Sequence, residues 1–261
     1  MTNKRTTWRT SRAGFTLIEL LIVVGIISLL LSILLPCLSR AKTLTRKTVC
    51  AVNIRHLHQA FMLYLMENDG KYFPYQENLT DGTLWYWGFE PAGASSEEGS
   101  RPVDTGRARL APYFQHAGAM QICPEARRIS THFKPKFNLA GYGYAINRCM
   151  LHDGAGNKRY DQITKPWETV AWADSMQINT WQEPASPSNP MLEEWYYLDN
   201  RINCPATFHF RHGGLCNSAF ADGSVRELSP FWLDSRCDGQ VGRPEQAVPP
   251  SKVSYLLQLD K

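Results

Sequence analysis

The sequence predicts an α+β fold, with one long N-terminal helix packed on an antiparallel β-sheet head that carries a long loop insertion. An apolar run of membrane length occupies residues 15–35, and a helical apolar stripe follows it. From Lys71 onward, short apolar or aromatic runs alternate with Gly, Pro, Asn and Asp, which is typical of strands and turns. The 261 residues, 43% hydrophobic and 20% charged, are ordinary for one globular domain with an appendage.

The net positive charge of the chain lies at its N-terminus. The formal net charge is +4, and residues 1–14 contain four basic and no acidic side chains. The rest of the chain is therefore formally neutral. This argues against nucleic acid as a partner, because binding to phosphates needs clustered basic side chains.

The apolar run Phe15–Leu35 has 21 residues, and Glu19 is its only charged residue. As a helix it would be ~31 Å long, which matches a hydrocarbon core of ~30 Å. A secretory signal would have a shorter apolar region and a cleavage site of small residues. A lipoprotein signal ending at Cys37 fits poorly, because Pro36 stands where a small residue is expected. The run therefore predicts a single membrane anchor.

Residues 12–20, Arg-Ala-Gly-Phe-Thr-Leu-Ile-Glu-Leu, resemble the prepilin processing motif of type IV pilins and type II secretion pseudopilins. The resemblance implies that residues 1–14 are a leader, which a prepilin peptidase/methyltransferase removes after Gly14. The same enzyme would then methylate the new amino group of Phe15. Pro36 falls where many pilins carry a helix-bending proline, and it is the expected kink of this helix.

Glu19 is the unusual residue of the anchor. A carboxylate in an apolar helix costs roughly 3 kcal/mol at the bilayer centre, and such residues are usually functional. So close to the start of the run, its side chain has the alternative of reaching the membrane interface. The resemblance implies an assembly role instead, in which Glu19 pairs with the terminal amine of a neighbouring subunit.

Helical periodicity continues beyond the membrane. Apolar residues recur at steps of three and four at Ile54, Leu57, Phe61, Tyr64 and Leu65, and the pattern stops at Asn68-Asp69-Gly70. We therefore divide the mature chain into a transmembrane and assembly helix (15–36), an amphipathic stem helix (37–69) and a β-rich head (70–261). The stripe should pack against a sheet.

Further strands are expected at 83–87, 141–147 and 169–173, with a loop over 91–104. The Pro, Ser and Asn cluster at 184–190 marks the long insertion. Near the end of the fold, Asp222-Gly223 between two apolar runs predicts a β-hairpin with a type I′ turn.

The segment from His212 to Asp222-Gly223 resembles the His-x9-Asp-Gly motif of a group of prepilin-type proteins. Residues 122–124 and 141–147 also resemble the body pattern of that group. The two motif side chains have two interpretations: they pin a loop to the hairpin by hydrogen bonds, or they form a cation or partner site. Asn217 and Asp222 offer oxygens for a structural calcium ion, which needs ~6–8 ligands. No other cofactor is expected.

Cys37 belongs with the membrane helix, and the pairing of the other six cysteines is open; they are Cys50, Cys123, Cys149, Cys204, Cys216 and Cys237. Cys204 and Cys216 are the closest pair and would brace the intervening segment as a disulfide. The set Cys204, His209, His212 and Cys216 is an alternative zinc site. Free thiols are the third possibility. On one extended strand His209 and His212 would point to opposite faces, which weighs against zinc.

The function predicted is that of a structural assembly subunit and not of an enzyme. Common catalytic and nucleotide-binding motifs are absent from the sequence, and a hydrolase built on His212, Asp222 and Asp174 lacks a recognisable geometry.

The resemblance implies a single-pass protein of the bacterial inner membrane, with a cytoplasmic N-terminus and a periplasmic head. Its partners would be copies of itself or other pilin-like subunits, the inner-membrane assembly platform, and the lipid bilayer before assembly. The filament would be a type II secretion pseudopilus or a type IV pilus-like fibre, in the periplasm or on the cell surface. The alternative is a membrane-tethered module that binds carbohydrate or another envelope ligand through the aromatic clusters at 85–89 and 195–197.

Overall fold

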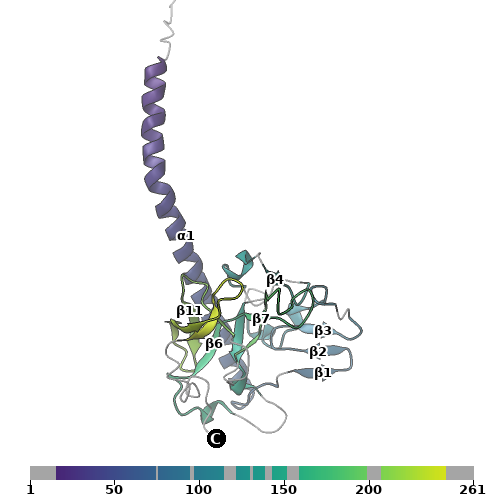
Figure 1. Ribbon diagram of the computed structural model, residues 1–261. Helices are drawn as coiled ribbons and strands as arrows, with labels where there is room; N and C mark the ends of the chain where they lie inside the picture. The colour runs from purple at the N-terminus through teal and green to yellow at the C-terminus, as the bar shows by residue number, and fades with distance from the viewer. Residues whose placement is uncertain are drawn as a thin grey trace, which may run out of the picture. The chain divides into compact units, whose positions relative to one another are not determined.

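The computed structural model describes residues 16–74, 76–94, 97–114, 122–129, 132–138, 143–151, 159–198 and 207–244. The chain divides into two compact units between Leu44 and Thr45. The helix α1, Leu17–Glu67, contributes to both units, and every described strand belongs to the second (Figure 1). One long N-terminal helix followed by antiparallel and mixed sheets confirms the predicted α+β, pilin-like class.

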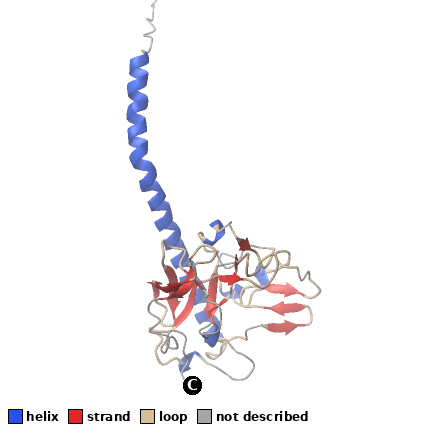
Figure 2. Cartoon of the chain, in the orientation of Figure 1, coloured by secondary structure: helices blue, strands red, loops and turns tan. Residues whose placement is uncertain are grey.

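The first part of α1 is apolar and exposed. It is the one helix of the described residues that is long and apolar enough to cross a membrane, by length and composition. Among the residues that the structure describes, none covers its large side chains; Leu17, for example, is 81% exposed. Pro36 lies inside α1, which continues through it (Figure 2). The helix is therefore not interrupted at Pro36, and the kink stays a prediction.

The second part of α1 carries the predicted apolar stripe, and all five of its residues are buried in the core. The helix ends where the pattern stops. Asp69 and Gly70 both have positive φ, and the Gly70 N–H donates to the Leu65 carbonyl at 2.7 Å. A left-handed residue after the last turn satisfies a carbonyl that would otherwise lack a partner, so this short polar sequence stops the helix.

A five-stranded sheet packs against this stripe. Its order is β12-β11-β6-β5-β9, and all neighbours are antiparallel except β5 and β9. Phe61 of α1 meets Trp172 of β6 edge to face, with ring centroids 5.8 Å apart. The expected helix-on-sheet packing is confirmed. The strands are β5 (Tyr144–Asn147), β6 (Val170–Asp174), β9 (Tyr197–Leu198), β11 (Cys216–Phe220) and β12 (Val225–Leu228).

Three smaller sheets complete the described strands, with orders β1-β2-β3, β10-β14-β13 and β4-β8-β7. Only the pair of β4 and β8 is parallel among them. Their strands are β1 (Glu77–Leu79), β2 (Gly82–Leu84), β3 (Phe89–Pro91), β4 (Phe133–Lys134), β7 (Gln177–Asn179), β8 (Met191–Glu193), β10 (Phe208–His209), β13 (Pro230–Leu233) and β14 (Val241–Pro244). Short 3-10 helices occur at Thr105–Arg107, Ala111–Tyr113, Ala126–Arg128, Arg148–Met150 and Tyr160–Gln162.

The predicted strands are present as β2, β5 and β6. Strand β2 ends at Leu84 and β5 begins at Tyr144, so both are shorter than expected, whereas β6 has the predicted length and is shifted by one residue. The insertion is more ordered than its composition indicated. The cluster at 184–190 lies in the connection between β7 and β8, which pair with each other as antiparallel strands. A Pro- and Ser-rich sequence predicted the connection correctly but could not reveal the strands on either side of it.

The Asp222-Gly223 hairpin is confirmed, but its turn type is different. Strands β11 and β12 pair from Cys216 opposite Leu228 to Ala219 opposite Val225. Only Gly223 has positive φ, whereas a type I′ turn needs it at both central positions. The Gly223 N–H donates to the Phe220 carbonyl at 2.9 Å, which makes a type I turn followed by a left-handed glycine.

The aromatic clusters at 85–89 and 195–197 belong mainly to the core. Tyr86, Trp87, Tyr196 and Tyr197 are all buried. Trp87 stacks on Tyr196 with ring centroids 4.1 Å apart, so the two clusters pack against each other. Buried rings cannot serve as a platform for carbohydrate, and the observation that motivated the binding-module alternative is accounted for by packing.

Candidate functional site

The first candidate site is the start of α1, where Thr16 and Glu19 form a capping box. The Thr16 N–H and hydroxyl donate to Glu19 Oε2 at 2.9 and 2.8 Å, and the Glu19 N–H donates to Thr16 Oγ1 at 3.2 Å. These bonds satisfy backbone N–H groups that the first turn of a helix leaves without partners. The sequence signal of this motif is a Thr followed three residues later by Glu, and it is not among the predicted features. Gly14 and Phe15 lie outside the described residues.

The second candidate site is a buried polar cluster around Asp174, at the end of β6. Asp174 is fully buried, and its carboxylate has partners on every side. Oδ2 lies 3.2 Å from His212 Nε2 and accepts from the Asn217 N–H at 2.9 Å. Oδ1 lies 3.2 Å from Cys50 Sγ and 3.7 Å from Arg211 Nε. A buried carboxylate needs such partners, because burying it without them would cost roughly several kcal/mol of folding free energy.

Four segments far apart in the sequence supply this cluster. Cys50 lies on α1 one turn before Ile54, on the buried side of the helix. Cys123 follows a segment outside the described residues, and His212 lies in the turn after β10. The thiol, imidazole and carboxylate ligand atoms of Cys50, Cys123, Asp174 and His212 all lie within 4.8 Å of one another.

Arg211 is held beside the cluster by the backbone. Its Nη2 donates to the carbonyls of Gly143 and Ser175, both at 2.9 Å. A Cβ at Gly143 would lie 2.6 Å from Arg211 Nη1. Gly143 also has φ +71°, so the position needs glycine both for its backbone conformation and for the space that the guanidinium fills.

The charges of the cluster shift the pKa values of its members. Burial alone would raise the pKa of Asp174, but the Arg211 charge and the His212 hydrogen bond outweigh it and lower that pKa. Burial opposes the charged form of His212, yet its bond to Asp174 raises the pKa to about 9. Cys50 has a raised pKa, chiefly through burial. For Cys123, burial is outweighed by the Cys50 hydrogen bond and the Arg211 charge, which lower the pKa to about 5.

A cysteine, a histidine and an aspartate so close together resemble the parts of a nucleophilic relay, but the geometry differs. In a relay the two ring nitrogens of the histidine have different partners: one faces the nucleophile and the other faces the carboxylate. Here His212 Nε2 faces both, at 3.6 Å from Cys123 Sγ and 3.2 Å from Asp174 Oδ2. His212 Nδ1 is buried without a partner among the described residues. Because the thiol and the carboxylate face the same ring nitrogen, this arrangement differs from a nucleophilic relay.

The predicted pair His212 and Asp222 takes separate partners. His212 joins the buried cluster, while Asp222 caps its own turn and accepts from the Ser224 N–H at 2.9 Å and hydroxyl at 2.6 Å. Asn217 donates through its amide to the Lys47 carbonyl of α1 at 3.2 Å, so it connects β11 with the helix. His212 therefore bonds to β6 and Asn217 to α1, and the pinning of the loop to the hairpin by His212 and Asp222 stays a prediction. Calcium at Asn217 and Asp222 stays a prediction.

The thiols of the predicted disulfide and zinc sets remain only partly described. Cys204 lies outside the described residues, so its pairing with Cys216 stays a prediction. Cys216 is buried, with Sγ 3.6 Å from the Asp174 carbonyl. His209 pairs with Asp238, Nε2 to Oδ2, at 2.9 Å. Of the predicted zinc set, the four-residue cluster shares only His212.

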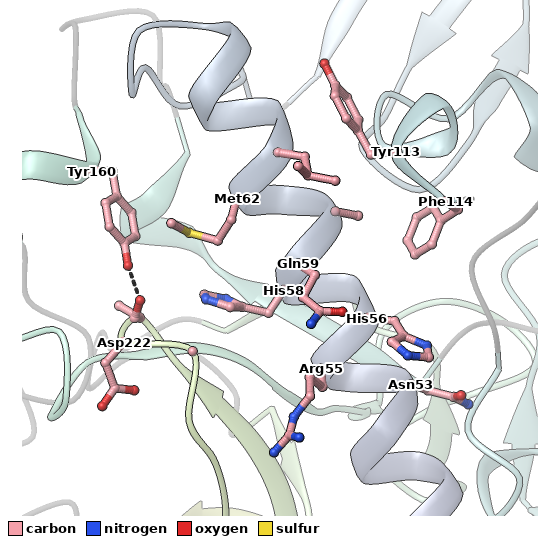
Figure 3. A pocket seen from close by; sticks show the side chains of 14 residues that line it. Asn53, Arg55, His56, His58, Gln59, Met62, Tyr113, Phe114, Tyr160 and Asp222 are labelled. Atoms are coloured by element: carbon pink, nitrogen blue, oxygen red, sulfur yellow. Dashed lines mark hydrogen bonds between the residues drawn. The ribbon is translucent and has the colours of Figure 1, made fainter.

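A cavity of about 900 Å³ borders α1 on the side of the hairpin turn. Figure 3 shows His58 of the helix pointing toward the turn that carries Asp222, near Tyr160. Tyr160 donates to the Ala221 carbonyl, and a Cβ at Gly223 would lie 3.9 Å from His58 Nε2. Six of the lining residues are His56, His58, Tyr113, Phe114, Tyr160 and Asp222.

Burial of His58 makes the stability of the head dependent on pH. Desolvation lowers its pKa to about 4, against the opposing charge of Asp222. Below its ordinary pKa near 6.5 the unfolded chain binds a proton that the folded chain refuses, so stability falls as pH falls from about 6.5 to 4. The wild-type chain should lose up to about 3 kcal/mol over this window relative to His58→Leu, measured by urea unfolding. Parallel pH profiles for the two chains would contradict this role of His58.

Residues 9–35 match the family described as the prokaryotic N-terminal methylation motif. No curated protein and no solved structure matches the chain. Residues 9–35 are therefore similar to the N-terminus of prepilin-type proteins, a class that includes pilins and pseudopilins. The long apolar helix and the β-rich part that follows it form the α+β, pilin-like arrangement expected behind such a motif.

Proposed function

We propose that this chain is a structural subunit that a prepilin peptidase cleaves after Gly14 and methylates on Phe15. The mature subunit then assembles through α1 into a type II secretion pseudopilus or a type IV pilus-like filament. The observation that carries the proposal is the methylation motif over 9–35 together with the first part of α1, whose large apolar side chains are exposed among the described residues.

The exposed apolar part of α1 needs to be covered, first by the bilayer and then, after assembly, by neighbouring helices in the filament. The described part of the anchor buries none of its most apolar window, so a bilayer must cover it first. In a filament, neighbouring helices would replace the lipid. The capping box satisfies the first turn of α1 locally and leaves the charge of Glu19 available for the terminal amine of another subunit.

The membrane topology and partners follow from the same proposal. The leader would face the cytoplasm, where the peptidase acts, and the head would lie in the periplasm. The inner-membrane assembly platform would extract the subunit from the bilayer and add it to copies of itself or to other pilin-like subunits. The buried state of both aromatic clusters gives this role more support than the envelope-binding alternative.

Intact-mass spectrometry of the membrane protein tests the processing step. The expected mass lacks residues 1–14 and carries one additional methyl group. A chain with Gly14→Val, in which a branched side chain replaces the glycine before the cut, should retain the leader and serve as the control. An uncleaved wild-type chain, or a lipid attached to Cys37, would contradict the proposal.

A further inference from the structure

The buried cluster contains four donor groups of the types that bind zinc: two thiols, one imidazole and one carboxylate. Cys50, Cys123 and Asp174 are fully buried, and His212 is 3% exposed. Structural zinc sites are closed and four-coordinate, with cysteine and histidine as the commonest ligands and carboxylates also used. The cluster therefore has the ligand number, the ligand types and the burial of a structural site.

The distances within the cluster agree with a tetrahedral arrangement around one ion. Bond lengths of roughly 2.0–2.3 Å from zinc to N, O and S place neighbouring ligand atoms about 3.3–3.8 Å apart. His212 Nε2 lies 3.2 Å from Asp174 Oδ2 and 3.6 Å from Cys123 Sγ, and Cys50 Sγ lies 3.2 Å from Asp174 Oδ1. Cys50 and His212 approach different carboxylate oxygens of Asp174, and the four ligand atoms all lie within 4.8 Å of one another, so a central ion draws the more distant pairs together by about 1 Å.

The direction of the donors also favours an ion at the centre. A thiol and a carboxylate both face the same imidazole nitrogen, although a single nitrogen can share only one proton with them. A cation bound by the thiolate, the carboxylate and the imidazole nitrogen would give each of these groups a partner. A Cys50–Cys123 disulfide would use only two of the four donors and would give His212 and Asp174 no reason to converge there.

The groups around the cluster balance the charge of a loaded site. Two thiolates, one carboxylate and a neutral imidazole around Zn²⁺ carry a net charge of −1, and Arg211 beside Asp174 supplies +1. The Asn217 N–H donates to the carboxylate, and the Tyr144 hydroxyl lies 3.4 Å from Cys50 Sγ. Such outer hydrogen bonds orient metal ligands and are a usual part of metal sites.

We propose that Cys50, Cys123, Asp174 and His212 form a structural zinc site that fastens the stem part of α1 to the head. Binding releases two protons, one from Cys50 and one that Cys123 and His212 share, because the ligands are two thiolates, a carboxylate and a neutral imidazole; no oxidation state changes. The ion joins α1, the segment before the 3-10 helix Ala126–Arg128, the end of β6 and the turn after β10, which makes it a single crosslink among four chain segments.

Zinc binding by the full chain tests the site. The chain is purified in detergent with a thiol reductant, and Zn²⁺ is titrated in competition with a chromophoric chelator. We expect one tight site per chain. Co²⁺ in place of Zn²⁺ should give the visible absorption of tetrahedral Co²⁺ and a thiolate-to-metal charge-transfer band. This spectrum uses the wild-type chain, so it decides the question even if the variants fail to fold.

Variants identify the ligands. Cys50→Ser, Cys123→Ser, Asp174→Asn and His212→Gln should each weaken Zn²⁺ binding by at least about 100-fold, because each removes a direct ligand. Cys216→Ser is the matched control, since it changes another buried thiol close to Asp174. It should leave the affinity within a few-fold of wild type, as should His209→Gln.

Three outcomes would overturn the site. The first is a wild-type chain without tight zinc or tetrahedral Co²⁺. The second is a loss of binding in Cys216→Ser or His209→Gln with binding retained in Cys50→Ser, which would point to the set that includes Cys204. The third is protein isolated without reductant that holds a Cys50–Cys123 disulfide, shown by peptide mapping, and no zinc.

Discussion

Replacement of Glu19 by alanine should prevent the subunit from entering filaments while leaving cleavage after Gly14 intact. In an assembled bundle, the methylated amine of a neighbour would then enter an apolar environment without a counter-charge. An uncompensated charge there costs about 3 kcal/mol, which corresponds to about a 100-fold loss of association. The measurement compares the sheared filament fraction with the membrane fraction by immunoblot, and checks processing by mass.

Glu19→Gln separates the helix-capping role that the structure shows from the proposed assembly role. Glutamine at this position can still accept the Thr16 hydrogen bonds of the capping box, but it carries no charge. It should therefore fail to assemble as alanine does. Leu20→Ala, on the same exposed turn, is the control that keeps the charge and should assemble far better. Normal filaments from Glu19→Gln would show that Glu19 acts only as a helix cap.

Gly143→Ala should destabilise the head by up to about 5 kcal/mol. A left-handed conformation costs a residue with a Cβ about 1–2 kcal/mol, and overpacking adds about 1–3 kcal/mol. The new Cβ would lie 2.6 Å from Arg211 Nη1 and 2.9 Å from Ala126 Cβ. The guanidinium cannot move freely, because its other nitrogen donates to two backbone carbonyls. Displacing Arg211 would also remove a buried positive charge that lies 3.7 Å from the Asp174 carboxylate.

Gly93→Ala provides the matched control for this prediction. Gly93 has φ +69°, close to that of Gly143, but no atom lies within 4 Å of its added Cβ. Its substitution should cost only the conformational part, about 1–2 kcal/mol. Both chains are compared by chemical unfolding in chelator, so that they are in the same metal state. Equal losses for the two variants would mean that Arg211 has room to move.

The elements that could be predicted from the sequence are those governed by local patterns. The stripe from Ile54 to Leu65 predicted both the helix and its buried face, because residues three and four apart share one side of a helix. The end of α1 followed from Asn68-Asp69-Gly70, and the β11–β12 hairpin followed from Asp222-Gly223. The turn type was wrong because the sequence Asp-Gly suits both a type I′ turn and a type I turn followed by glycine.

The buried cluster could not be predicted in the same way. The expected zinc set drew its members from Cys204 to Cys216, because residues close in sequence are the only ones that spacing can group. The structure groups residue 50 with residues 123, 174 and 212, and Asp222 with its own turn. Cys50 was treated as one of several unassigned thiols, and Asp174 only as a member of a doubtful hydrolase.

The sequence by itself determined that this chain carries a prepilin-type N-terminus, a long helix with an exposed and a buried half, and a β-rich second part. Each of these depends on periodicity or on a contiguous motif, which the chain carries wherever it folds. Only the tertiary structure decided which face of the stem meets Trp172 and which residues surround Asp174. Packing the α1 stripe on β6 brings Cys50 to the end of that strand, and the partners of a buried carboxylate must come from whatever segments the fold places there.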